Sequence, residues 1–401
     1  MTALHLAVAL EGAGWHPAAW RDPAARPAGL FEASYWAELV AEAERGLLDF
    51  VTIEDALGLQ SSRFEGPDDR TEVVRGRLDA VLLAARVAPL TSRIGLVPST
   101  SVTHTEPFHV SIGIASLDFA SGGRAGWRPQ ISARAADAAH FGRREFPALT
   151  LDEMRGPRGR AFAAELFAEA SDAVEVVRRL WDSWEDDAEI RDAATGRFLD
   201  RDKLHYIDFE GPHFSVRGPS ITPRPPQGQP LVAALAHDDL PFDFAARGAD
   251  VVFVTPESHV EAAELVGRVR AAESAAGRTG EPLKVFAELV VLLDAAPGAA
   301  AARRARLDGL TAIASDAAIF TGTPGELAEL LLLWRGAGLD GFRLRPGVLP
   351  YDLTQITRGL VPELQRRGAF RTEYTAGTLR GHLGLPRPAS RYATPAPGGR
   401  S

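Results

Sequence analysis

The chain alternates between short apolar runs and longer segments with helical periodicity. Eight runs have the length of strands, and most of them are rich in Val, Leu, Ile, Ala and Phe: residues 4–10, 49–55, 93–101, 125–132, 230–236, 249–255, 283–293 and 340–346. Apolar positions recur at helical spacing over residues 34–46, 74–88, 106–121, 173–184, 259–275, 323–338 and 354–368. Near-continuous apolar strands that alternate with helices are typical of a parallel sheet covered by helices.

Eight such repeats over this length predict an α/β fold, a (β/α)₈ barrel with insertions that forms a single domain over residues 1–401. The alternation lapses between about 133 and 229, where we expect an insertion that contains a hairpin at 205–218. A C-terminal extension covers about 370–401. The alternative fold is a doubly wound sheet. Its usual Gly-rich phosphate loop is incomplete here, because "LEGAGWHP" has Gly12 and Gly14 but no third glycine.

Net charge and composition exclude several classes of function. A formal net charge of −9 argues against a nucleic-acid partner. The chain has no cysteine, which removes disulfides, thiolate metal ligands and Cys nucleophiles together. The first residues lack the cationic start of a secretory signal. No apolar run approaches the roughly 18 residues that a membrane span requires. We therefore expect a cytoplasmic protein without a membrane partner.

In a (β/α)₈ barrel, the chemistry lies at the C-terminal ends of the strands. That rule selects polar residues near the ends of several predicted strands: His16, Glu54, Asp55, Ser99, Ser101, His104, Arg128, Gln130, Ser132, His237, Asp238, Arg343 and Arg345. Period-two alternation places Arg128, Gln130 and Ser132 on one face of the fourth strand.

Each of these residues also has a purely structural interpretation. Asp55 is equally suited to capping the next helix, and Ser99 to Thr103 suit a solvated turn. His237 and Asp238 suit a helix N-terminus, and Arg343 and Arg345 suit ion pairs with acidic neighbours. His104 has no carboxylate at metal-ligand spacing, so we predict no metal site. The spacings alone do not identify a reaction.

Several long stretches resemble one known family. They include "RIGLVPSTSVTHTEPFHV" (93–110), "HYIDFEGPHFSVRGPSITPRPPQGQP" (205–230) and "VLPYDLTQITRGLVPELQRRGAFRTEY" (348–374). Through them the chain resembles the bacterial luciferase-like flavin monooxygenases, in the branch that includes nitrilotriacetate and dibenzothiophene-sulfone monooxygenases. The resemblance runs nearly end to end and implies a barrel with insertions that forms a homo-oligomer.

The resemblance also implies a reaction. Such enzymes take reduced FMN from a separate flavin reductase and react it with O₂ to form a flavin C4a-(hydro)peroxide. That species then oxygenates a small organic substrate, while the protein holds the flavin and excludes water. Carried over residue by residue, the family pattern matches Asp55 after the second strand and small hydroxylated residues, Ser99 and Ser101, on the third.

The family's fourth strand ends in Thr-Ser and carries an Asn where this chain has Arg128. Ser132 is retained, and Gln130 lies on the same face. From this we predict His16, His104 and Arg128 as catalytic residues. The predicted flavin-binding residues are Asp55, Ser99, Ser101, Gln130, Ser132, Ala236, His237 and Asp238. A cation at Arg128 would stabilise an anionic reduced flavin or a carboxylated substrate, and Arg128→Ala is expected to weaken the binding of one of them.

The phosphate end departs from the family pattern. The loop after the fifth strand typically reads Gln-Ala-Gly-x-Ser, whereas here Asp238 replaces the serine and His237 precedes it. The family's Tyr corresponds to Phe167. A carboxylate about 4 Å from a phosphate, at an effective dielectric constant of about 20, opposes binding by several kcal/mol. Two alternatives therefore stay open: a non-catalytic barrel that serves as the partner subunit of a paralogue, and a barrel that uses a different flavin-like cofactor such as a deazaflavin.

Overall fold

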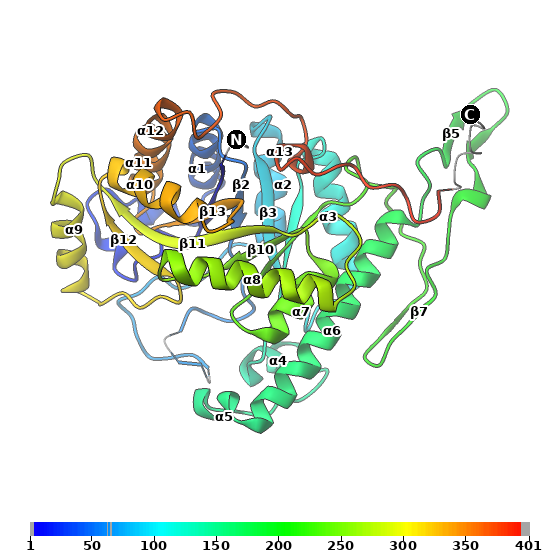
Figure 1. Cartoon of the computed structure of the whole chain (residues 1–401). Helices are drawn as coiled ribbons and strands as arrows, with labels where there is room; N and C mark the ends of the chain where they lie inside the picture. The colour runs from blue at the N-terminus through cyan, green and yellow to red at the C-terminus, as the bar shows by residue number, and fades with distance from the viewer. Residues whose placement is uncertain (1–3, 62, 65, 394–401) are drawn as a thin grey trace.

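The computed structural model describes residues 4–61, 63–64 and 66–393, and in this part of the chain eight parallel strands close into a barrel (Figure 1). They are β1 (His5–Leu10), β2 (Phe50–Ile53), β3 (Gly95–Ser101), β4 (Gly126–Gln130), β9 (Leu231–Leu235), β10 (Val251–Val254), β11 (Lys284–Leu293) and β13 (Gly341–Pro346). Their order is β10-β9-β4-β3-β2-β1-β13-β11, and the pairing of β10 with β11 closes the ring. The predicted (β/α)₈ barrel is confirmed and the doubly wound alternative is wrong.

The helices lie outside the strands. Most of them lie near the positions that the periodicity predicts, whereas the helix at Asp239–Gly248 was not among the predicted helical segments. They include α1 (Ala33–Arg45), α2 (Ala80–Val87), α3 (Pro107–Ser121), α7 (Asp239–Gly248), α8 (His259–Ala275), α10 (Pro324–Arg335), α11 (Tyr351–Gln355) and α12 (Val361–Arg366), the last two joined by a π-helical turn (Ile356–Leu360). Local signals set the helix ends. Thr323 and Glu326 form a capping box at the start of α10, and Gly122 ends α3 with a positive φ of 66°.

Further elements, between β11 and β13, also escaped the sequence pattern. Strand β12 (Ala318–Gly322) pairs with the C-terminal half of β11 and lies beside the barrel rather than in its wall. Helix α9 (Ala299–Asp308) precedes it. The sequence of α9 is mostly Ala and Arg, so it lacks the periodic large apolar residues that reveal a helix. The predicted second helix begins late, at Ala80, because the described residues of the preceding segment, 55–61, 63–64 and 66–79, form no helix or strand.

The insertion after β4 contains α4 (Ala135–Phe141), α5 (Leu151–Arg155) and the long helix α6 (Pro157–Asp182). Two short antiparallel pairs follow, β5 (Glu189–Asp192) with β6 (Arg197–Leu199), and β7 (Phe209–Glu210) with β8 (Ser215–Val216). The second pair is the hairpin predicted at 205–218. Both pairs project from the barrel at the right of Figure 1.

The C-terminal segment closes the barrel at the N-terminal ends of its strands. Helix α13 (Leu379–His382) brings Leu379 into a buried cluster with Phe50, Phe253 and Phe286. Glycine makes room for it, because a Cβ atom at Gly95 would lie 2.5 Å from a Leu379 methyl group. The part of the predicted extension beyond residue 393 lies outside the described residues.

Candidate active site

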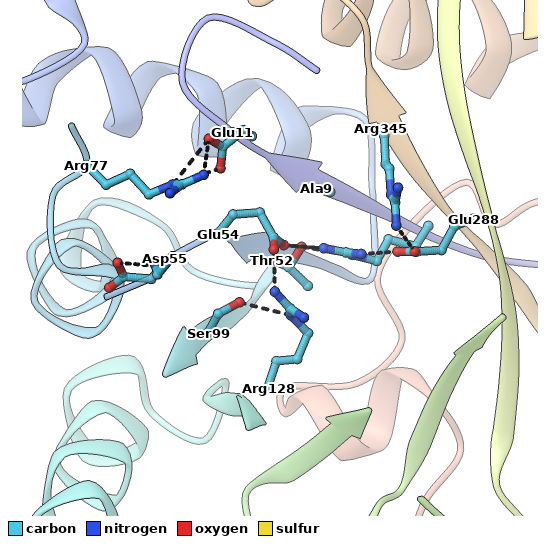
Figure 2. Close-up of polar contacts among 12 residues, drawn as sticks. Ala9, Glu11, Thr52, Glu54, Asp55, Arg77, Ser99, Arg128, Glu288 and Arg345 are labelled. Atoms are coloured by element: carbon cyan, nitrogen blue, oxygen red, sulfur yellow. Dashed lines mark hydrogen bonds and ion pairs between the residues drawn. The ribbon is translucent and has the colours of Figure 1, made fainter. Parts of the chain in front are cut away.

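The barrel interior holds a chain of buried ion pairs (Figure 2). Glu54, directly after β2, receives hydrogen bonds from Arg128 of β4 and Arg343 of β13. Arg343 also donates to Glu288 of β11, which accepts a second bond from Arg345. The chain of charges thus crosses the barrel from β4 to β11.

This network is balanced in charge. Arg345 ends it by pairing with Asp316 at 2.5 Å, so three guanidiniums face three carboxylates. Burial opposes the ionisation of Glu54, but the neighbouring Arg128 and Arg343 hold the pKa of its carboxyl at about 2. Burial lowers the pKa of Arg343 to about 9, which leaves it charged at neutral pH. The pairs are therefore ionised, and Arg128 is not a free cation.

A cavity of about 580 Å³ opens above this network, where β1 to β4 end. Each of these strands contributes a polar residue at or just beyond its C-terminus. The loop after β2 and the loop after β4 complete the walls. The polar lining residues are Glu11, Glu54, Asp55, Gln60, Ser61, Arg77, Ser101, Gln130, Ser132, Arg134 and Asp137. The volume is in the range typical of small-molecule sites.

Most charges of the cavity wall have partners within the chain. Arg77 donates to both carboxylate oxygens of Glu11, the nearer at 2.8 Å (Figure 2). Asp55 accepts N–H groups from Ala56 and Ala80, and burial raises the pKa of its carboxyl. Asp55 thus also supports the start of α2, as its structural interpretation required, although the cap residue itself is Asp79.

The structure brings six predicted site residues to this region. Asp55, Ser101, Gln130 and Ser132 line the cavity. Ser99 and Arg128 lie beneath it, joined by a 2.9 Å hydrogen bond from the guanidinium to the hydroxyl. Ser101 and Gln130 are register partners in β3 and β4. Among the described residues, the buried Ser101 hydroxyl has no hydrogen-bond partner.

The predicted histidines lie elsewhere. His16 lines a neighbouring cavity of about 420 Å³ and bonds Asp308 at 3.1 Å. His104 packs against the rings of Phe141 and Phe146, away from the cavity wall. Burial lowers the pKa of both imidazoles.

The predicted phosphate loop also lies outside the large cavity. Ala236 is buried in the barrel wall, where its N–H bonds the carbonyl of Phe253. His237 bonds Thr255 and lies 3.5 Å from Asp316. Asp238 is the cap residue of α7, which matches the helix N-terminus interpretation. Phe167 packs edge-on against Phe244.

Sequence reasoning missed Glu288, Arg77, Glu11 and Arg134 as site residues. Glu288 had a signal, since it is the one acidic residue inside the apolar strand "KVFAELVVLL". The interpretation of Arg343 and Arg345 as members of ion pairs is confirmed. Glu11, Arg77 and Arg134 lie outside the strands and helices, where no periodicity indicates which way a side chain points.

Comparison with known proteins identifies the family. The model of the luciferase-like monooxygenases matches residues 13–336. The chain belongs to the luciferase-like monooxygenase family. Nitrilotriacetate monooxygenase component A from Aminobacter aminovorans is 31% identical, over 98% of this chain and 99% of the relative. N-acetyl-S-(2-succino)cysteine monooxygenase from Bacillus subtilis is 32% identical, over 97% and 98%.

Solved structures of monooxygenases have a similar fold. The EDTA monooxygenase from Chelativorans sp. BNC1 is 25% identical, with a TM-score of 0.79 over 96% of this chain and 99% of that one. The protein is therefore an enzyme of the flavin-dependent monooxygenase class. Within the described residues, no helix is long and apolar enough to cross a membrane, and no cluster of three or more His, Asp or Glu could hold a metal.

The cavity fits the ring of a flavin better than the predicted loop fits its phosphate. The unpartnered Ser101 hydroxyl and the side chains of Gln130 and Asp55 offer donors and acceptors to the polar edge of an isoalloxazine. The loop at His237 and Asp238 offers a carboxylate where a phosphate needs N–H groups, hydroxyls or cations.

Proposed function

We propose that the protein binds reduced FMN delivered by a separate flavin reductase and uses O₂ to oxygenate a small organic substrate. The observation that carries this proposal is the cavity at the ends of β1 to β4, with its buried, unpartnered Ser101 hydroxyl. It lies at the end of the barrel where enzymes of this fold hold their ligands.

The residues of this chain have defined tasks in such a reaction. Ser101, Gln130 and Asp55 would hold the flavin ring. When bound, the reduced flavin supplies the electrons that activate O₂. The Glu54–Arg128 pair forms a polar but charge-neutral floor. Trp15 and the loop after β2 wall the cavity and limit the access of water, which protects reactive species from hydrolysis. We also propose that the protein works in the cytoplasm as a homo-oligomer.

A flavin titration tests the proposal. The purified protein is mixed with oxidised FMN and, under anaerobic conditions, with photoreduced FMN, and binding is followed by fluorescence and calorimetry. We expect the reduced form to bind, and Ser101→Ala to weaken this binding because the variant removes only the hydroxyl. Failure of reduced FMN to bind the wild-type protein would contradict the proposal.

A second function rests on the acidic phosphate loop. Ala236, His237 and Asp238 lie outside the cavity, and Asp238 opposes a dianion. Subunits A and B of pristinamycin IIA synthase from Streptomyces pristinaespiralis are each 29% identical to this chain. These observations favour a partner subunit that supports a catalytic paralogue. Absence of binding to FMN, riboflavin and a deazaflavin, together with a stable complex with such a paralogue, would select this function.

A further inference from the structure

The wall of the large cavity contains a cation without a counterion. Arg134, just beyond the end of β4, lines the cavity. In the described part of the chain, no carboxylate pairs with its guanidinium and no hydrogen bond to it is formed. The other arginine of the wall, Arg77, is neutralised by Glu11. Desolvating an unpaired guanidinium costs free energy, and a ligand that supplies an anionic partner would offset that cost.

Neutral donors line the same cavity. The Ser101 hydroxyl is buried and unpartnered, and it is the register partner of Gln130. The side-chain amide of Gln130 also forms no hydrogen bond with the described residues, although its backbone carbonyl accepts one from Val102. The proposed function assigns these two groups to the flavin ring, which leaves the Arg134 guanidinium for the substrate. A guanidinium binds the two oxygen atoms of a carboxylate in a fork.

We propose that Arg134 recognises a carboxylate of the substrate inside this cavity, so that the enzyme acts on organic acids rather than on neutral molecules. This inference rests on the proposed function, because it assigns the substrate class of the same site.

The charges of the cavity favour a carboxylate over a phosphate. Asp137 accepts a hydrogen bond from Ser132 at 2.6 Å, and Asp55 is held by two backbone N–H groups. Both carboxylates stay in the wall and repel anions. A phosphate dianion would meet twice that repulsion, and among the described residues of the wall Arg134 is the one guanidinium without an ion pair to offset it. A monoanionic carboxylate is matched by Arg134 in charge and in geometry.

The test compares matched ligands and matched variants. Calorimetry measures the binding of 3-phenylpropionate, a monoanion, and of its neutral methyl ester to the wild-type protein, to Arg134→Gln and to Arg160→Gln. Arg160 is an exposed arginine of α6 and serves as the control. We expect 3-phenylpropionate to bind the wild-type protein and Arg160→Gln alike, and to bind Arg134→Gln about tenfold or more weakly, the size of a lost charged hydrogen bond.

A parallel titration with reduced FMN and reduced riboflavin separates this inference from the proposed function. Equal affinity of reduced FMN for the wild type and Arg134→Gln is expected. Acid binding that depends on Arg134, in a protein that binds no reduced flavin, would overturn the proposed function and leave the carboxylate site standing. The inference is overturned if 3-phenylpropionate does not bind, if the ester binds as well as the acid, or if Arg134→Gln selectively loses FMN and not riboflavin.

Discussion

Arg128 shows how a buried partner changes the role of a cation. Its side chain is only 7% exposed and pairs with Glu54, whose own charge is shared with Arg343. Because the Glu54 carboxylate neutralises Arg128, the guanidinium attracts an anionic ligand in the cavity only weakly. Arg128 therefore acts on the site mainly by holding Glu54 and Ser99 in place.

We therefore expect Arg128→Ala to lower the stability of the fold rather than to act mainly on ligand binding. Removing one partner of a buried ion pair leaves the other charge uncompensated, and we expect a loss of about 3 kcal/mol in the free energy of unfolding. The variant Glu54→Gln combined with Arg128→Ala should lose less than the sum of the two single changes, because it removes one charge of each sign and keeps the buried network neutral. Urea unfolding of the four proteins measures this coupling, and strictly additive losses would count against it.

Glu288 carries a larger share of the network. It is fully buried and holds both Arg343 and Arg345. Glu288→Gln removes the charge that two guanidiniums share, so we expect a loss of about 3 to 5 kcal/mol. The control is Glu363→Gln, which breaks surface ion pairs with Arg366 and Arg367 and should cost far less, because surface ion pairs are screened by solvent. Similar urea midpoints for the two variants would refute the expected difference.

At the scale of elements, the barrel could be predicted because its strands are buried on both faces. Continuous apolar runs such as "ADVVFVT" have few other interpretations, and the strand observed there is β10. The late start of α2 at Ala80 and helix α9 could not be predicted, since neither segment carries a strong hydrophobic period. The residues of the candidate site divide in the same way. Ser101 and Gln130 could be predicted because they lie at the C-terminal ends of strands, whereas the positions of Arg134 and Arg77 depend on loop conformation.

The short helix α13 tests whether a terminal element is part of the barrel. Leu379 is fully buried against Phe50 and lies beside Gly95. We expect Leu379→Ala to lower the free energy of unfolding by about 2 to 5 kcal/mol, as for other large-to-small changes in a core. Leu333→Ala is the control, because Leu333 is 58% exposed on α10 and should cost little. A loss for Leu379→Ala no larger than that of the control would show that α13 does not contribute to the core.

At the scale of the whole molecule, buried carboxylates connect segments that are distant in the sequence. Glu54 joins β2 to β4 and β13. Asp250, before β10, accepts hydrogen bonds from Arg178 of α6, Arg380 of α13 and the N–H of Val232. Burial opposes its ionisation, but Arg178 and Arg380 hold the pKa of its carboxyl at about 2. The insertion and the C-terminus are thus tied to the barrel through one charge.

This arrangement predicts how the fold responds to acid. The pKa of Asp250 is lower in the folded protein, about 2, than the ordinary 3.8 that we expect after unfolding. Its contribution is therefore complete above the unfolded value and is lost as the pH falls toward the folded one, and it amounts to about 2 kcal/mol. Glu54, with a folded pKa of about 2 and an ordinary value of 4.5, adds to the same loss.

The variant Asp250→Asn isolates the contribution of Asp250. We expect the difference in unfolding free energy between the wild type and Asp250→Asn to be constant between about pH 6 and pH 7, and to shrink progressively below about pH 4 as the wild-type carboxylate loses its advantage. Urea unfolding followed by circular dichroism at several pH values between 3 and 7 measures it. Asp243→Asn, which changes an exposed ion pair on α7, should show no such trend. A difference for Asp250→Asn that stays constant down to pH 3 would mean that this carboxylate is not the acid-sensitive link between the barrel, α6 and α13.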